Sequence, residues 1–240
     1  MKEVIYEIIE SAEIAPAVFE MRLRGDVSAF FKAGQFIDIR IPGKYLRRPI
    51  SVCDYDDDGL TIVYKVVGEG TRALSEMKAG GKINALAGLG NGFDEFVSAE
   101  NIALIGGGIG LPPLYNLAKR LKTNGKRVTV IAGFNTAREA YYLDKFGAIA
   151  DVKVATADGT LGTKGFVTAV FDRREYDYFY ACGPEPMLAA LVATGADGQL
   201  SYEARMGCGF GACMGCSCKT RLGAKRICKD GPVMTAEEMR

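Results

Sequence analysis

Five of the seven cysteines lie within the last 33 residues of the chain. Clustered thiols in a chain without an export signal indicate a metal site rather than disulfides. The segment reads Cys208-x4-Cys213-x2-Cys216, a spacing typical of a 2Fe–2S cluster, and Cys228 supplies the fourth thiol. Interspersed glycines permit the tight wrapping that four thiolates around two irons require. We therefore predict that the cluster ligands are Cys208, Cys213, Cys216 and Cys228.

The fifth cysteine of this segment, Cys218, leaves the ligand set open. It lies only two residues after Cys216, and we expect its side chain to point away from the cluster, although it could replace one ligand. A structural zinc site also accepts four thiolates, but such sites usually combine two C-x2-C pairs. Because one such pair is present here, zinc is the weaker alternative.

A glycine-rich segment, Gly106-Gly107-Gly108-Ile109-Gly110, follows an apolar run and precedes two prolines. Such a turn from strand to helix lets a pyrophosphate approach the backbone and lie at the helix N-terminus. A purely structural tight turn is the competing interpretation. Cys182-Gly183-Pro184 repeats the arrangement after a later apolar run. An isolated Cys182 would be interpreted as a small buried hydrophobe, but the paired turns favour a nucleotide site.

A third motif, Arg48-Pro49-Ile50-Ser51, opens another apolar run. The planar guanidinium fork suits a phosphate, and Ser51 adds a hydroxyl. Gly70-Thr71 begins a short predicted helix whose N-terminus could bind a second phosphate. The competing interpretation is that Arg47 and Arg48 form a solvated basic pair.

The composition excludes several kinds of chemistry. Histidine is absent, which excludes imidazole acid–base catalysis and histidine-bound metals, so cofactors or another chain must supply the chemistry. With 30 Lys and Arg against 29 Asp and Glu, there is no electrostatic reason to expect nucleic acid or an anionic membrane as partner. No run approaches the roughly 18 apolar residues of a transmembrane helix, and the first residues lack a signal-peptide pattern. We expect a cytoplasmic protein.

Residues 1–97 predict an all-β domain. Short runs rich in Val, Ile, Tyr and Phe are separated by Gly, Pro and Asp, which favours a small antiparallel barrel interrupted by a short helix over Thr71–Met77. The predicted strands are Val4–Ile9, Val18–Leu23, Phe36–Ile41, Ile50–Cys53, Leu60–Val67 and Lys82–Ala87.

Residues 98–203 alternate between strand and helix periods, which predicts a parallel sheet with flanking helices and ligands at the carboxyl ends of its strands. The predicted strands are Ile102–Ile105, Val128–Ala132, Val152–Ala155, Phe166–Phe171 and Tyr178–Ala181, and the predicted helices are Leu111–Leu121, Arg138–Phe146 and Pro184–Ala193. Residues 204–240 show neither period and are too few to bury a core of their own. The fold class is thus multi-domain β plus α/β, with a short C-terminal iron–sulfur subdomain.

Together these motifs resemble the ferredoxin-NADP reductase superfamily, with Ile50 replacing the commoner Tyr of its flavin motif. The segment ending in Cys228-Lys229-Asp230-Gly231-Pro232-Val233 narrows the resemblance to the electron transfer subunits of dihydroorotate dehydrogenase B, over essentially the whole chain. The resemblance implies FAD at Arg48, Pro49, Ile50 and Ser51, flanked by Val63, Tyr64 and Lys65, with its phosphates at Gly70 and Thr71. It implies NAD at Gly106, Gly107, Gly108 and Gly110 and at Cys182, Gly183 and Pro184. It implies the same four cysteine ligands.

Two details concern the nicotinamide nucleotide. We expect Cys182 to lie near the nicotinamide as a packing and positioning group. Relatives that use NADP hold its 2′-phosphate with Ser and Arg, whereas this chain has Asp158 in the corresponding region. An acid there would repel a phosphate and favour NAD, although Arg138 nearby weakens the inference.

The resemblance also implies a function. Electrons would pass from the FMN of a separate catalytic subunit through the 2Fe–2S cluster and FAD to NAD+, in pyrimidine biosynthesis and in a two-plus-two heterotetramer. The chain would not oxidise dihydroorotate alone. One alternative is a flavin and iron–sulfur NAD(P)H reductase subunit of another complex, glutamate-synthase-like or hydrogenase-like. Another is a non-catalytic module that senses redox state or is stabilised by zinc.

Overall fold

The computed structural model describes all 240 residues, and its first part is a closed six-stranded barrel with strand order β1-β2-β5-β4-β3-β6. Every pair of neighbouring strands in it is antiparallel. Alternate residues of β1 point inward, so that Tyr6 and Ile8 are buried. The predicted barrel is confirmed. Its elements are β1 (Lys2–Ala15), β2 (Val18–Arg24), β3 (Phe36–Ile39), β4 (Arg48–Asp56), β5 (Gly59–Lys65), α1 (Glu69–Ser75) and β6 (Lys82–Leu89).

The second part is a sheet of order β10-β9-β8-β7-β11-β12-β15, in which only β15 is antiparallel to its neighbour. The central strands β7 and β11 are almost entirely apolar because helices cover them. The predicted parallel sheet is confirmed. Its elements are β7 (Asn101–Gly107), α2 (Tyr115–Thr123), β8 (Arg127–Phe134), α3 (Leu143–Gly147), β9 (Asp151–Thr156), β10 (Thr163–Lys164), β11 (Tyr178–Cys182), α4 (Glu185–Ala193), β12 (Gly198–Ser201) and β15 (Val233–Thr235).

Three predicted elements of this part differ in the structure. Phe166–Phe171 is a loop with one 3-10 turn, because Val167 and Phe171 face the core four residues apart, at a helical rather than a strand spacing. The predicted helix Arg138–Phe146 is interrupted at Tyr142, whose φ of 65° is left-handed. The helix expected from Leu111 begins as 3-10 turns and becomes α-helical at Tyr115, after the two prolines.

The last part contains regular elements that the sequence did not predict. β13 (Ser217–Thr220) and β14 (Gly223–Arg226) form a hairpin, β15 joins the large sheet, and α5 (Ala236–Met239) ends the chain. The unpredicted strand β12 also has only four residues. β12, β13 and β14 each have only one apolar side chain, and β15 has three residues, so none of them shows a strand pattern.

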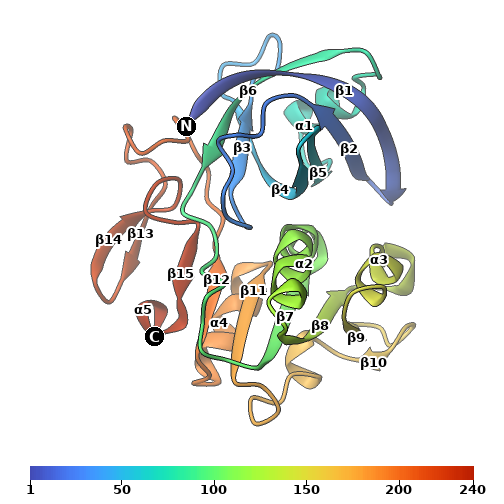
Figure 1. Cartoon of the computed structure of the whole chain (residues 1–240), viewed down its shortest axis with the longest axis vertical. Coiled ribbons are helices and arrows are strands. Elements are labelled where there is room, and N and C mark those ends of the chain that lie inside the picture. The colour runs from blue at the N-terminus through green and yellow to red at the C-terminus, as the bar shows by residue number, and fades with distance from the viewer.

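Figure 1 shows how the three parts meet: the barrel lies above, the sheet below, and the C-terminal elements at the left against both. Helix α2 lies between barrel and sheet. One apolar cluster runs through this interface, since the barrel side chains of Val18, Cys53 and Val63 pack with those of the sheet domain. The C-terminal segment shares a small core with Phe36 and Leu89 of the barrel. The division into residues 1–97, 98–203 and 204–240 remains a proposal.

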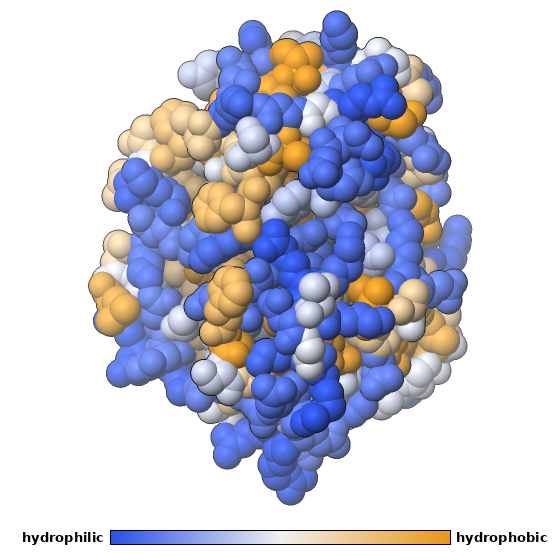
Figure 2. All heavy atoms as spheres, in the orientation of Figure 1, coloured by the Kyte–Doolittle hydropathy of each residue, from blue (hydrophilic) through white to orange (hydrophobic).

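The surface seen in this orientation is mostly hydrophilic, with an apolar area at the upper left, where Figure 1 places the segment between β12 and β13 (Figure 2). Phe210 and Met214, both in that segment, are exposed hydrophobic residues. None of the helices is long and apolar enough to cross a membrane.

Candidate functional site

Two backbone turns meet at the carboxyl edge of the parallel sheet. Gly106, the penultimate residue of β7, pairs with Cys182, the last residue of β11. Gly110 has no room for a side chain, because a β-carbon there would stand 2.1 Å from the carbonyl oxygen of Cys182. Gly107 is crowded in the same way by Pro184 and Met187. The two predicted nucleotide motifs are therefore one continuous structure, assembled by direct backbone packing.

These turns border a cavity of about 400 Å³. Its floor is glycine backbone from β7 and β8, and Phe134, Phe166 and Met187 form part of its walls. Its one ionisable side chain is Glu139, whose carboxylate accepts a hydrogen bond from the Asn135 side chain at 2.9 Å. A cavity at the carboxyl ends of parallel strands with a helix beginning beside it suits a dinucleotide.

The acid expected to favour NAD lies apart from this cavity. Asp158 does not line the cavity, because its carboxylate binds the backbone and side chain of Thr160 within its own turn, at 3.0 and 2.7 Å. Glu139 is the acid that faces the cavity. The signal for it was available in the sequence, since Glu139 follows the end of β8 by a few residues.

Cys182 lies at the centre of this edge. Burial raises the pKa of its thiol to about 12. The thiol therefore stays neutral at physiological pH and is a poor nucleophile, which agrees with a packing and positioning role.

On the barrel, the structure separates the two arginines of the third motif. Arg47 is engaged structurally: its guanidinium binds the Asn84 side-chain oxygen at 2.8 Å and forms an ion pair with Glu3 at 3.2 Å. Arg48 bonds only to the nearby carbonyl oxygens of Leu46 and Arg47, at 2.7 and 3.2 Å. Its guanidinium also lies directly over Gly70 at the start of α1. Arg48 is thus the arginine that can turn toward a phosphate.

The other predicted flavin residues divide by their orientation. In β4, Ile50 and Ser51 are half-buried and pair with β3, as does Pro49. In β5, Val63 packs in the interface cluster, and Lys65 shares its face of the strand. Tyr64 points the opposite way into the barrel core, so only its backbone can reach a flavin at the interface. The Thr71 hydroxyl is occupied by the backbone of Val67 and Gly68, which leaves Thr71 only its own backbone for a phosphate.

The cysteine segment places its thiols in two pairs. The Sγ atoms of Cys216 and Cys228 lie 3.2 Å apart and both residues are buried. The Cys208 sulfur accepts the backbone N–H groups of Ala212 and Cys213 at 3.2 and 3.4 Å, and it is hydrogen-bonded to the Cys213 side chain. Burial disfavours the Cys208 thiolate, but these donors outweigh it and lower the pKa of Cys208 to about 6. No three metal-binding side chains converge on one point.

The expected orientation of Cys218 is wrong. Residues two apart on an extended strand share a face, and Cys218 packs against the same small core that contains Cys216 and Cys228. Burial raises the pKa of its thiol. Cys218 also belongs to the paired strand β13, where it lies opposite Lys225.

Asp38 is a residue near the site that sequence reasoning missed. It is 2% exposed, its Oδ1 atom has no hydrogen-bond partner, and a β-carbon on Gly209 would stand 2.5 Å from its Oδ2 atom. Burial raises the pKa of Asp38 to about 7 against the opposing effect of Arg47. The signal was a lone acid inside the apolar run Phe36–Ile41. The Asp38 carboxyl is thus a buried polar group that lies between the barrel and the cysteine segment and has one oxygen without a hydrogen-bond partner.

Comparisons with known proteins agree with this geometry. Residues 203–240 match the family described as the iron-sulfur cluster binding domain of dihydroorotate dehydrogenase B. The chain is 43% identical to the dihydroorotate dehydrogenase B (NAD+) electron transfer subunit of Bacillus pumilus, over 100% of this chain and 98% of the relative. It is 42% identical to the subunit of the same name from Fusobacterium nucleatum, over 96% of this chain and 95% of the relative.

Solved structures show the same architecture. A chain from the structure of an NADH-dependent reduced ferredoxin-NADP oxidoreductase superposes with a TM-score of 0.88 at 31% identity, covering 98% of this chain and 89% of that one. The cytochrome P450 reductase GcoB of Amycolatopsis superposes with a TM-score of 0.71 at 24% identity, covering 80% and 65%, and shows the fold alone.

Proposed function

Because this chain belongs to the family of electron transfer subunits of dihydroorotate dehydrogenase B (NAD+), we propose that it passes electrons from the FMN of a catalytic partner subunit, through a 2Fe–2S cluster and FAD, to NAD+ in pyrimidine biosynthesis. Bound flavin would supply the exchange between single electrons and a hydride. The chain has no histidine for substrate acid–base chemistry, so dihydroorotate oxidation is assigned to the partner. The relatives favour this function over a reductase subunit of another complex.

The observation that carries the proposal is the pairing of the thiols. Each iron of a 2Fe–2S cluster needs two cysteine ligands, whereas a structural zinc needs four on one ion. Cys216 with Cys228 and Cys208 with Cys213 form two such pairs. The backbone N–H groups that reach Cys208 are those that stabilise thiolate ligands. We assign the cluster to these four cysteines, which have the spacing typical of a 2Fe–2S cluster, and leave Cys218 out.

The same reasoning assigns the flavin site to the barrel face beside the glycine turns. Arg48 would bind the pyrophosphate of FAD with its fork, together with the backbone of Gly70 and Thr71. Pro49, Ile50 and Ser51 would present the edge of β4 to the flavin ring, and Val63 and Lys65 the adjacent face of β5. Tyr64 would contribute its backbone.

The nucleotide is assigned to the cavity at the sheet edge. The backbone of Gly106, Gly107, Gly108 and Gly110 lets a pyrophosphate approach closely. Cys182, Gly183 and Pro184 would hold the nicotinamide end against the flavin site, with Cys182 as a neutral packing group. Glu139 faces the cavity with a negative charge, which favours the ribose hydroxyl of NAD over the phosphate of NADP.

We also propose the cellular setting. None of the seven cysteines forms a disulfide with another, which suits the reducing cytoplasm. A two-plus-two assembly with the catalytic subunit would place the cluster near the partner's FMN.

Co-purification tests the proposal most directly. The chain is purified anaerobically with the dihydroorotate dehydrogenase catalytic subunit from the same source, and NAD+ reduction driven by dihydroorotate is measured. We expect activity that needs both chains and that is lost in Cys213→Ser. The matched control is Cys53→Ser, a buried interface cysteine outside the cluster segment.

Two results would contradict the proposal in different ways. A yellow-brown protein that reduces dyes with NADH, but neither binds the catalytic subunit nor supports its turnover, would keep the cofactors and remove the pathway. A colourless protein with stoichiometric zinc would instead support the non-catalytic module.

A further inference from the structure

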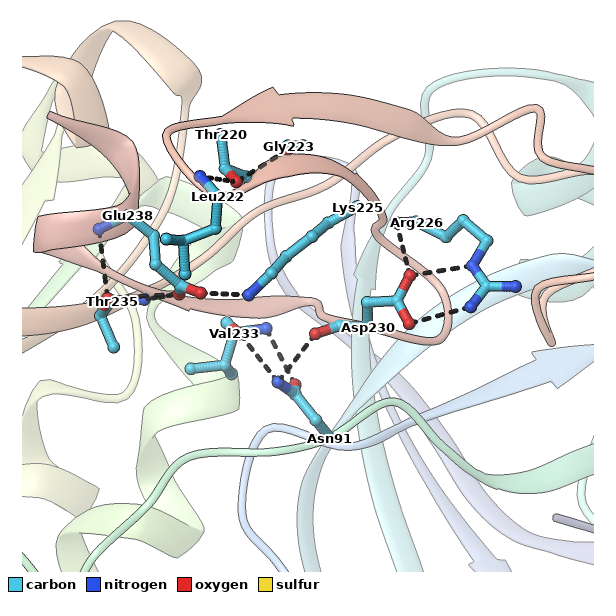
Figure 3. A network of polar contacts seen from close by, with 10 residues as sticks. All are labelled: Asn91, Thr220, Leu222, Gly223, Lys225, Arg226, Asp230, Val233, Thr235 and Glu238. Carbon is cyan, nitrogen blue, oxygen red and sulfur yellow. Dashed lines mark hydrogen bonds and ion pairs between the residues drawn. The ribbon is translucent and has the colours of Figure 1, made fainter.

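The turn that carries Cys228 is closed by a bidentate ion pair between Arg226 and Asp230. Arg226 Nε binds Asp230 Oδ2 at 2.8 Å and Arg226 Nη2 binds Oδ1 at 3.0 Å. The backbone N–H of Arg226 binds the same carboxylate at 2.9 Å (Figure 3). The carbonyl of Arg226 in turn accepts the N–H groups of Lys229 and Asp230 at 3.1 and 2.8 Å. The five residues around Cys228 are therefore held in a single conformation.

The remaining guanidinium nitrogen reaches a different segment. Arg226 Nη1 donates a hydrogen bond to the carbonyl oxygen of Gly211 at 3.0 Å. Gly211 lies between Cys208 and Cys213, in the loop whose N–H groups bind the Cys208 sulfur. Its φ of +92° is left-handed, and a β-carbon there would stand 2.6 Å from the Lys229 side chain. Arg226 thus joins the loop of one thiol pair to the turn of the other.

The far side of the same turn is tied to the barrel. The Asn91 side chain, just after β6, donates to the carbonyl oxygens of Asp230 at 3.2 Å and Val233 at 2.8 Å, and accepts the Val233 N–H at 3.1 Å (Figure 3). The Asn91 N–H binds Gly231 O at 2.8 Å. A continuous line of hydrogen bonds therefore runs from the flavin-binding barrel through Asp230 and Arg226 to Gly211.

An exposed ion pair contributes little to stability, but the Arg226–Asp230 pair is partly buried and has better geometry than most such pairs. The two side chains are only 27% and 32% exposed, the contact is bidentate, and a third bond crosses to another segment. A lysine could keep the charge but could not make all three contacts, because it lacks the planar fork.

We propose that Arg226 is a positioning residue that sets the two thiol pairs relative to each other and to the barrel, and thereby sets the potential of the cluster they hold. This inference rests on the proposed function. Loss of the Gly211 contact frees the loop that presents the Ala212 and Cys213 N–H groups to Cys208. Weaker N–H···S bonds stabilise the reduced cluster less, so its midpoint potential falls.

The test compares Arg226→Gln and Arg226→Lys with wild type in the full chain, reconstituted anaerobically with iron and sulfide. Arg221, in the turn of the same hairpin, bonds only through its backbone N–H to Glu238 O at 2.9 Å, so Arg221→Gln is the matched control. The measurements are the EPR spectrum of the reduced cluster, its midpoint potential, and the rate at which a chelator removes iron.

We expect Arg226→Gln to broaden the EPR spectrum, to lower the midpoint potential, and to lose iron about tenfold faster, as expected when one charge-assisted hydrogen bond is lost. Arg226→Lys keeps the charge but not the fork, so it should leave the midpoint potential lowered and should restore neither the linewidth nor the retention of iron. If Arg226→Gln assembles no cluster, the EPR linewidth and the rate of iron loss of Arg226→Lys decide whether Arg226 has the positioning role. Variants that match Arg221→Gln throughout, or a Lys variant equal to wild type, would overturn the positioning role. A wild-type chain without a 2Fe–2S signal would instead overturn the proposed function.

Discussion

The guanidinium of Arg48 lies directly over Gly70, so close that a β-carbon on Gly70 would stand 2.1 Å from Arg48 Nε. Arg48 lies in β4 and Gly70 lies in α1, and the two residues are 22 positions apart in the chain. The absence of a side chain at position 70 is therefore what allows an arginine and a helix N-terminus to share one small space.

This contact predicts that Gly70→Ala displaces Arg48 and weakens FAD binding. We expect the affinity for FAD to fall at least about tenfold, because a charge-assisted phosphate contact is lost. FAD occupancy is measured from the ratio of flavin to protein absorbance after dialysis. Gly68→Ala is the control, since Gly68 has an extended φ of −173° and nothing lies within 4 Å of an added β-carbon. Equal FAD retention in both variants would remove Arg48 from the phosphate site.

The pairing of thiols predicts which cysteine substitutions the cluster tolerates. Cys218→Ser should keep the full iron and sulfide content, because Cys218 lies outside the spacing of the four assigned ligands. Cys213→Ser should lose the cluster, because one iron would keep a single thiolate. Iron analysis and the EPR signal of the reduced protein check both variants. Cluster loss in Cys218→Ser would show that the ligand set is different from the one assigned here.

The cavity at the sheet edge predicts that Glu139 controls the choice of nucleotide. Glu139→Gln removes the negative charge and should raise the kcat/KM ratio of NADPH to NADH about tenfold, equivalent to ~1.4 kcal/mol. Dye reduction with each nucleotide gives the ratio. Asp158→Asn is the matched control, since Asp158 binds Thr160 in its own turn and lies outside the cavity. If only Asp158→Asn changed the ratio, the original assignment from sequence would be restored.

The raised pKa of Cys182 predicts an unreactive thiol and a specific pH dependence. Its pKa of about 12 lies above the ordinary value, so in native protein at pH 7.5 iodoacetamide should not modify it. Between the unfolded pKa and about 12, the Cys182 thiol keeps its proton in the folded state but loses it in the unfolded state. The stabilisation is therefore complete below the unfolded pKa and declines as pH rises toward 12. Cys182→Ala should lose less unfolding free energy than wild type between pH 8 and pH 10, measured by denaturant titration. Because Cys182 is only half-buried, rapid alkylation of the native thiol would contradict the raised pKa.

Local patterns predicted the large elements well. The strands of the barrel and the central strands of the sheet are long enough to show a period, and glycine turns signal themselves because few other residues adopt their backbone angles. The predictions failed where an element was short or where packing decided the conformation. Phe166–Phe171 is apolar like a strand, yet its core contacts are those of a helical turn. Tyr142 interrupts a helical pattern because its side chain packs in the interface between barrel and sheet.

By itself the sequence determined the chemistry of the protein: four thiols at cluster spacing, two glycine turns, an arginine motif, and no histidine. These are properties of residue type and local spacing, which the chain carries before it folds. Only the tertiary structure decided which of two adjacent arginines is available, which acid faces the cavity at the sheet edge, and that Arg226 binds Gly211 across two segments. Those choices depend on side chains brought together from distant positions, and packing and burial set them.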